Sequence, residues 1–452
     1  MASITLSYTF HIGLSLYQTN PYHHTARIMS AVTSFFCFLM LVMGAAIMTE
    51  TASAQKFGVY TLTMTSPNLL NVFSGDFSTG HITFVEAIAT GGNGTGVQSQ
   101  NALTVFGNYI FAVNPLSNSL SCFWINPQDP TIVKLVGNPI NTQGDYPDTV
   151  TASKFTHSSS SISSKTSLSP DAQAACVANT GANSGIACFT YNATTGLTLI
   201  QSSVQALSLG LTTPPGFHQG PGQIAFTPNN TGLVLVVKGR NPPVYFWPGS
   251  DVAAFTKTPA TSGPNGVDNF AFAFDSDSTL VLADTSPYNN GSGVIVVNLN
   301  TAGAGTVAFG TPDYFVLPNL QGSCWIRWSP VTTHFYVSNT ASGVITELAR
   351  EGSSLSIVHE ILLTNVSNPS DQVILNDFLF VNNAKLGQIW VLQLGGAGGG
   401  TWVQRAPNLG SGSGIAGFIA QPAPLTSTTS TPSSSDGVRS GGASFLSFFG
   451  EL

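Results

Sequence analysis

The stretch LVLVVKGRNPPVYFW at residues 233–247 holds the pattern that decides the fold. Two short runs of apolar, β-branched and aromatic residues flank a segment rich in Gly, Asn and Pro. Such a pattern is typical of a β-hairpin, because those turn residues suit the backbone angles that reverse a chain. The first run ends in a charged residue, Lys238. The stretch therefore predicts two antiparallel strands joined at this turn.

Six other stretches repeat this order of apolar run, polar residue, Gly- or Asn-rich turn and apolar run. Neighbouring units lie 44 to 65 residues apart, which leaves room for about four short strands in each. A further apolar run precedes three of the units, at residues 222–230, 268–277 and 324–330. The repeat predicts an all-β, seven-bladed β-propeller, with two stacked β-sandwiches as the alternative. The polar residues that end the first run of each unit are Thr63, Asn114, Asn179, Lys238, Asp284, Asn339 and Asn383.

Charged residues are scarce in this chain of 452 residues. It has 13 Lys and Arg against 20 Asp and Glu, which together make 7% of the residues and give a net charge of −7. Nucleic-acid binding is excluded, because it needs clustered Lys and Arg to neutralise phosphates. A charge-driven disordered chain is excluded as well, since 42% of the residues are hydrophobic. Blades that bury both faces against their neighbours explain strands with so little charge.

An apolar run at residues 31–48 follows Arg27 and precedes the small residues Ala52, Ser53 and Ala54. A basic flank, an apolar centre and such a cleavage site predict a secretory signal peptide that is cut before Gln55. The alternative is an uncleaved signal anchor, because the run is nearly long enough to span a bilayer. Met29 would give a leader of more usual length and is an alternative start.

We expect the propeller to occupy residues 55–420, between the leader at 1–54 and a tail at 421–452. A run around Trp402 is expected to supply the last strand, which closes the ring with the N-terminal segment. The tail is rich in Ser, Thr and Pro, which predicts a disordered segment without a core. Its apolar end, at residues 443–452, is shorter than a usual GPI signal, which stays as the alternative. The mature protein is expected to be a secreted, extracellular monomer without a membrane segment, with the cell wall as one destination.

Four cysteines follow the leader, which suits an oxidising compartment: Cys122, Cys176, Cys188 and Cys324. We expect Cys176 and Cys188 to form a disulfide, because they flank a Gly- and Asn-rich hairpin turn. Four buried free thiols are the alternative. The sequence has no CxxC or paired-His spacing, so neither a metal site nor a cofactor is expected. Glycosylation is predicted at the five sequons, which begin at Asn93, Asn192, Asn229, Asn290 and Asn365.

With these units laid out, the chain resembles the lactonase-type seven-bladed propellers. More narrowly, it is similar to secreted fungal proteins described as 3-carboxymuconate cyclase-like. The resemblance covers about Lys56 to Gln421 and implies a lactone-forming or lactone-opening reaction without a metal, or a secreted relative that has lost it. These motifs are mainly blade strands, so they specify the fold better than the activity. The matching stretches are residues 58–96, 220–239, 324–348 and 377–394.

Candidate site residues follow from the chemistry of a carboxylate or lactone substrate. His218, in a loop just before an apolar run, is the candidate general acid and base. Arg240 and Arg327 are candidate catalytic clamps, because a guanidinium donates paired hydrogen bonds to a carboxylate. Lys238, Asp268 and Asp284 are candidate substrate-binding residues. Each also has a plain structural reading, such as a solvated charge, an aromatic contact or a turn cap.

Two hypotheses of function remain open at this point. The favoured one is a non-catalytic, glycosylated extracellular or cell-wall propeller that binds glycans or other proteins. The alternative is a metal-independent lactonase or muconate cycloisomerase acting on a small carboxylate or lactone. The scarcity of Arg and Lys counts against a tricarboxylate substrate. If His218, Arg240 and Arg327 meet in one funnel, the enzyme hypothesis gains support.

Overall fold

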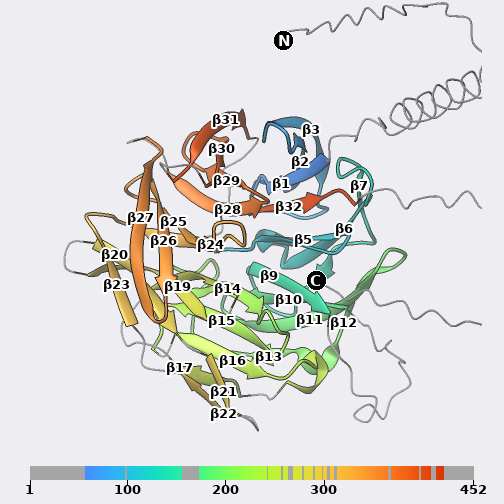
Figure 1. The fold of residues 1–452 in the computed structure, drawn as a ribbon. Helices are drawn as coiled ribbons and strands as arrows, with labels where there is room; N and C mark the ends of the chain where they lie inside the picture. The colour runs from blue at the N-terminus through green and yellow to red at the C-terminus, as the bar shows by residue number, and fades with distance from the viewer. Residues whose placement is uncertain are drawn as a thin grey trace, which may run out of the picture.

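The computed structural model describes residues 56–421, apart from 97–98, 155–172, 242, 256–257, 263–267, 277–278, 289–290, 298, 303–305, 310–312, 365–367, 396–398 and 409–413. The predicted leader, the tail beyond Gln421 and the sequons at Asn290 and Asn365 lie outside these residues. The described strands form seven antiparallel sheets around a ring, so the fold is the predicted seven-bladed β-propeller (Figure 1).

The blades are numbered here in chain order, and the strands of each are given from the channel outward. Blade 1 contains β32 (Ile415–Ile419), β1 (Lys56–Leu62), β2 (Leu69–Asp76) and β3 (Ile82–Ala89). Blade 2 contains β4 (Leu103–Phe106), β5 (Tyr109–Asn114), β6 (Ser119–Ile125) and β7 (Val133–Leu135), with β8 (Ile140–Asn141) also paired to β6. Blade 3 contains β9 (Pro147–Lys154), β10 (Gln173–Asn179), β11 (Gly185–Asn192) and β12 (Gly196–Leu199), with β13 (Gln205–Ala206) also paired to β11.

Blade 4 contains β14 (Gly220–Phe226), β15 (Gly232–Lys238), β16 (Val244–Pro248) and β17 (Ala260–Ser262). Blade 5 contains β18 (Asn269–Phe274), β19 (Leu280–Tyr288), β20 (Gly291–Val297) and β23 (Asp313–Pro318). Blade 6 contains β24 (Ser323–Trp328), β25 (Phe335–Asn339), β26 (Val344–Glu351) and β27 (Ser354–Leu362). Blade 7 contains β28 (Pro369–Leu375), β29 (Phe378–Asn383), β30 (Gln388–Gln393) and β31 (Thr401–Pro407).

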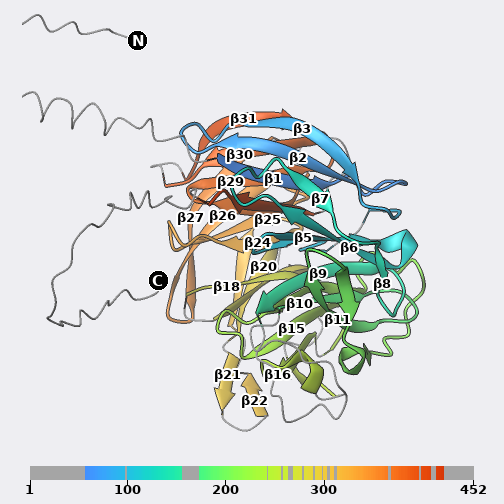
Figure 2. The same ribbon diagram turned by 90° about the vertical axis from the view of Figure 1, so that its right-hand side faces the viewer.

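Other elements are short. The hairpin of β21 (Leu299–Ala302) and β22 (Thr306–Phe309) is inserted in blade 5 and lies at the periphery of the ring (Figure 2). Three 3-10 turns occur among the described residues: η1 (Pro115–Ser117), η2 (Gln201–Ser203) and η3 (Val252–Ala254). No helix within the described ranges is long and apolar enough to cross a membrane.

The seven residues that centre the sequence repeat are structurally equivalent. Each lies at the end of the second strand of its blade, with Thr63 directly after β1 and Asp284 just before a register shift in β19. The hairpins of second and third strands are therefore the repeating units that the sequence predicted. We call the end of the ring at which the innermost strands begin the start face, and the opposite end the end face.

Burial along the blades explains the low charge. All seven residues of β15 are buried, since a central strand is covered by the blades on both sides. The outermost strand β3 is instead exposed along most of its length. Fully burying one large apolar side chain contributes about 1.5–3 kcal/mol, and the largest fully buried ones among the described residues include Trp247, Trp390, Tyr60 and Tyr336.

The strand that closes the ring differs from the prediction. The run around Trp402 forms β31, the outermost strand of blade 7, where Trp402 remains 39% exposed. The ring is closed by β32, which pairs antiparallel with β1 and places the first and last described strands in one sheet (Figure 1). Trp402 packs edge-on against Trp390 and beside Arg405, so an outer-edge strand accounts for its aromatic pattern.

A short segment crosses the channel just before β4. The Gln100 side chain donates through Nε2 to the Ile326 oxygen (2.9 Å) and the Phe272 oxygen (3.3 Å), and Oε1 accepts from the Ile326 nitrogen (2.9 Å). Its own backbone nitrogen donates to the oxygen of Gly222 at 3.0 Å. Gln100 thus joins blade 2 to blades 4, 5 and 6, and it separates the start-face side of the channel from the end-face side.

The predicted cysteine pair is joined in the structure. Cys176 and Cys188 face each other across β10 and β11 and form a disulfide. Cys122 and Cys324 are buried free thiols. Three sequon asparagines, Asn93, Asn192 and Asn229, are exposed, although their glycosylation remains a prediction.

Candidate functional site

Two neighbouring cavities open on the start face. The larger has a volume of about 560 Å³ and the smaller about 120 Å³, and Phe217 lines both. The larger cavity is lined by Phe217, His218, Thr285, Ser292, Gln321, Gly322, Cys324, Thr340, Ala341 and Asn368. The smaller is lined by Gly96, Tyr146, Asp148, Pro215, Gly216, Phe217, Gln219 and Lys238.

A histidine–carboxylate pair lies at the rim of the larger cavity. His218 belongs to the loop between β13 and β14, and its Nδ1 bonds Asp268 Oδ2 in the loop before β18. The same oxygen accepts from the Thr285 hydroxyl at 2.5 Å, while the Asp268 backbone oxygen accepts from the Thr285 nitrogen at 3.1 Å. The His218 side chain is 60% exposed and that of Asp268 only 14%. When Nδ1 donates to the Asp268 carboxylate, Nε2 of the neutral imidazole is the nitrogen that can accept a proton.

Neighbouring groups fix this pair in place. Asp284 Oδ1 accepts from the backbone nitrogen of Asp268 at 3.0 Å, so the predicted binding residue Asp284 acts by holding Asp268. Phe217 meets the His218 ring edge-on, with centroids 4.5 Å apart, and also contacts Phe270. The loop that carries His218 is therefore anchored on aromatic side chains of the channel.

A buried charged pair lies beside the smaller cavity. Both Lys238 and Asp148 are 2% exposed. Burial lowers the pKa of Lys238, opposed by the carboxylates of Asp148 and Asp268. Burial raises the pKa of Asp148 to about 6, opposed by Lys238 and by a hydrogen bond from Ser99. Lys238 Nζ also lies 4.4 Å from the centroid of the Phe270 ring, a cation–π contact.

Bulges at the start of the innermost strands give these side chains their positions. The register with the second strand shifts directly after the first residue pair in blades 3, 5 and 6, where Asp148, Phe270 and Cys324 are the extra residues, and one pair later in blade 4, at Gly222. A bulge changes the direction of a side chain relative to a regular strand. Asp148 and Cys324 thereby line the start-face cavities. Burial raises the pKa of the Cys324 thiol to about 12, so it is not a nucleophile at neutral pH.

The predicted site residues do not all meet. His218 and Asp268 form one pair, and Lys238 lies close enough to Asp268 to interact with its charge. Arg240 follows Gly239, whose backbone passes the His218 loop, but it lines neither start-face cavity in the described residues. Arg327 lies on the end-face side of Gln100, where it bonds Asp371. The expected clamp of His218, Arg240 and Arg327 in one funnel is therefore absent among the residues that the structure describes.

Sequence reasoning missed Asp148, Thr285 and Phe217. Asp148 carried a usable signal, because it is a carboxylate at the start of the alternating polar and apolar residues 149–152, a pattern typical of a strand. Thr285 and Phe217 carried none, since Thr and Phe are common along the chain. Within the described ranges, no group of three or more His, Cys, Asp or Glu side chains is placed to hold a metal ion.

Comparison with known proteins shows the fold class. Neither known protein families nor curated protein sequences gave a match to the chain. Among solved structures, a "putative 6-phosphogluconolactonase" from Bacteroides fragilis aligns with a TM-score of 0.61 and 16% identity, over 81% of this chain and 99% of the other. A protein of the same description from Bacteroides uniformis aligns with a TM-score of 0.57 and 13% identity, over 81% and 100%. The chain thus shares the propeller fold of these two proteins, and at such low identity the likeness extends to the fold alone.

Proposed function

We propose that the start-face funnel hydrolyses a small lactone or ester without a net negative charge, with His218 as the general base. The observation that carries the proposal is the His218–Asp268–Thr285 chain of hydrogen bonds at the rim of a cavity of about 560 Å³. A base oriented by a carboxylate beside a cavity is a recurrent arrangement in hydrolytic sites. The lactonase-type fold of the structural neighbours supports the same reaction class.

Hydrolysis needs one group that takes up and returns a proton, and one hydrogen-bond donor to the carbonyl oxygen of the substrate. His218 Nε2 takes a proton from water as the water oxygen attacks the carbonyl carbon. The ring C–O bond then breaks, and the imidazolium returns the proton to the leaving alkoxide. The Ser292 hydroxyl lines the cavity, and its oxygen accepts from the Gly322 nitrogen at 2.8 Å. Its own hydrogen makes only a long bond, 3.4 Å, to the Thr285 oxygen, so the hydroxyl can donate to the carbonyl oxygen.

The lining of the cavity sets the charge of the substrate. Besides His218, its described lining consists of hydroxyl, amide, thiol and apolar groups, with no Arg or Lys. A tricarboxylate would enter without partners for its charges, which is costly in a partly dry site. The cavity therefore favours a neutral lactone over a muconate-type substrate or a phosphorylated lactone.

Hydrolysis of glucono-δ-lactone and of 6-phosphoglucono-δ-lactone, followed by acid release above the spontaneous rate, tests the proposal. We expect faster turnover of the neutral lactone. His218→Ala should lower kcat by about 100-fold or more, the usual contribution of a general base. Asp268→Asn should lower kcat less, because the base stays but loses its orientation. His81→Ala is the matched control, since His81 is exposed on blade 1, away from the funnel.

Background rates on both lactones, unchanged by His218→Ala, would overturn the proposal. That result would favour the other sequence-based hypothesis, a non-catalytic extracellular or cell-wall protein, which no feature of the described residues specifically supports. A preference for the phosphorylated lactone would contradict the charge argument while leaving the role of His218 in place.

A further inference from the structure

A third cavity lies on the opposite side of Gln100. It has a volume of about 340 Å³ and is formed by the innermost strands of five blades, β4, β9, β24, β28 and β32. Most of its lining residues have apolar side chains, although polar atoms contribute more than half of the exposed lining, and Arg327 is the one charged residue among the described lining. The lining residues are Asn101, Leu103, Thr104, Val105, Thr151, Ala152, Arg327, Trp328, Val373, Ile374, Ile415, Ala416 and Gly417.

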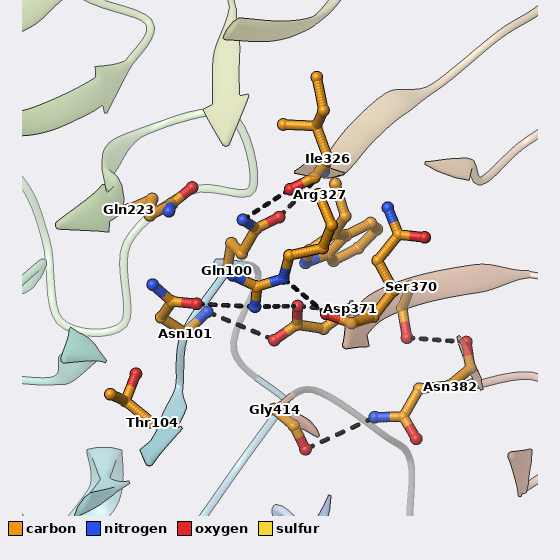
Figure 3. Close-up of polar contacts among 12 residues, drawn as sticks. Gln100, Asn101, Thr104, Gln223, Ile326, Arg327, Ser370, Asp371, Asn382 and Gly414 are labelled. Carbon is orange, nitrogen blue, oxygen red and sulfur yellow. Dashed lines mark hydrogen bonds and ion pairs between the residues drawn. The ribbon is translucent and has the colours of Figure 1, made fainter. Parts of the chain in front are cut away.

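The Arg327 guanidinium is held on one side by three groups (Figure 3). Its Nε donates to the Gln372 oxygen at 2.6 Å, and its Nη2 donates to Asn101 Oδ1 at 2.7 Å and to Asp371 Oδ1 at 3.2 Å. Nη1 makes no hydrogen bond to any residue that the structure describes. The Arg327 side chain stays 23% exposed although Asp371 is fully buried.

Asp371 compensates the guanidinium charge only in part. Its carboxylate also accepts from the backbone nitrogen of Gln372 at 2.9 Å and from that of Asn101 at 3.3 Å. Each of these amide dipoles takes up some of the carboxylate charge. The single Arg327–Asp371 contact, at 3.2 Å, is also longer than a usual charge-assisted bond. Positive potential therefore remains at the Nη1 side of Arg327.

The position of Arg327 in the repeat shows that its charge is not needed to build a blade. Its partner on the second strand of blade 6 is Tyr336, and the equivalent innermost-strand residues include Thr104, Thr151, Val373 and Ala416. These four residues are neutral and line the same cavity. The fold thus tolerates small neutral residues at this level of the channel, and a charge here is not required to build a blade.

We propose that the end-face cavity is a second ligand site, which binds a small monocarboxylic acid with an aliphatic or aromatic body. The carboxylate accepts hydrogen bonds from Arg327 Nη1, and the body of the acid packs on the apolar walls. A molecule with several carboxylates does not fit, because the described lining offers one cation. This site is separated from the His218 funnel by Gln100 and does not depend on the proposed hydrolytic activity.

Isothermal titration of the folded chain with benzoate and hexanoate tests the proposal, with benzamide and hexanamide as neutral controls of nearly the same shape. We expect saturable binding of the acids and at least tenfold weaker binding of the amides. Arg327→Lys should weaken acid binding about tenfold, because a lysine keeps a charge near Asp371 but loses the planar fork. Val105→Phe, which narrows the cavity without touching Arg327 or Asp371, should weaken it to a similar extent.

His218→Ala separates this site from the funnel and should leave acid binding unchanged. Loss of acid binding in His218→Ala, or acid binding that survives both Arg327→Lys and Val105→Phe, would overturn the proposal. So would equal affinity for acid and amide, or no saturable binding of either acid to the unmodified chain. A thermal unfolding curve for each variant shows that any loss of binding occurs in a folded protein.

Discussion

Lys238 departs most clearly from the pattern of its own repeat. At equivalent positions of other blades, short side chains bind groups of their own blade or of the preceding one. Asn114 Oδ1 accepts from Asn68 and Thr90, and Asn339 Oδ1 accepts from Ser323. Lys238 has no acceptor atom to do this, and its ammonium instead interacts with Asp148 and Asp268. In an internal repeat, a residue whose type differs from those at the equivalent positions is therefore a candidate site residue.

The pairing of Lys238 with Asp148 predicts a strongly non-additive pair of substitutions. Lys238→Met should lower the free energy of unfolding at pH 7 by about 3 kcal/mol, because it leaves a buried carboxylate without its cation. Adding Asp148→Asn should restore most of that loss. Urea denaturation of the two single variants and the double variant measures the coupling. Additive losses would show that the two charges do not interact across the cavity.

The same pair has a pH dependence of defined sign. The pKa of Asp148 is raised to about 6 in the folded state, so folding favours its protonated form. The contribution of Asp148 to the free energy of unfolding is therefore greatest below its ordinary pKa and is lost as the pH rises through about 6. The destabilisation caused by Lys238→Met should accordingly be smaller at pH 5 than at pH 7.

At the scale of elements, one carboxylate joins three strands of blade 6. Glu347 on β26 accepts from Tyr336 on β25 at 2.7 Å, and it also pairs with His334 and with His359 on β27, each at 2.8 Å. Burial opposes ionisation of Glu347, but these hydrogen bonds and the charge of His334 outweigh it and lower its pKa. The carboxylate therefore ties the middle of the blade to its outer edge.

Acid unfolding should depend on this residue. A lowered pKa in the folded state stabilises the fold above the ordinary pKa of a glutamate, about 4.3, and this contribution is lost as the pH falls through the folded-state value. Glu347→Gln should therefore lower the melting temperature at pH 6 and flatten its decline between about pH 5 and 3. The exposed Glu86→Gln is the matched control. An equally steep decline in both variants would contradict the role given to Glu347.

Elements that one contiguous stretch of sequence encodes were predictable. Elements that depend on contacts with distant strands were not. The hairpins of second and third strands were predicted correctly because each lies in one contiguous stretch, as at residues 233–247. β31 and β32 were confused, because β32 is only five residues long and lacks aromatic alternation. The bulges that direct Asp148 and Cys324 into the funnel depend on register between strands, which composition does not reveal.

The site shows the same limit. His218 and Asp268 were selected by residue type and do meet, although they lie 50 residues apart in the chain. Arg327 was selected for the same reason but lies beyond Gln100, at a depth in the channel that only the register of β24 with β25 determines. Residue type therefore identified the chemistry that the chain can supply, and strand register decided which groups share a cavity.

At the scale of the whole molecule, the scarcity of charge follows from the ring. Seven blades pack face to face, so most strand positions are covered on both sides. The charged groups described above lie in two places separated by Gln100, with Lys238, Asp148, Asp268, Asp284 and His218 on one side and Arg327 with Asp371 on the other. This separation gives each face of the propeller its own chemistry.

The stability of the ring should depend on the pairing of β32 with β1. Five residue pairs, from Phe57 with Ile419 to Thr61 with Ile415, join the two ends of the described chain. Phe57 of β1 also packs on Phe380 of blade 7, with centroids 5.4 Å apart, so the first blade is covered only when the ring is closed.

Removing residues 414–452 deletes the innermost strand of blade 1 and exposes the edge of β1. We expect this truncation to lower the melting temperature by about 10 °C or more, or to cause aggregation, because several large buried side chains lose their cover. Removing residues 422–452 keeps every described strand and should leave the melting temperature unchanged, and equal stability of the two truncated chains would show that β32 does not hold the ring closed.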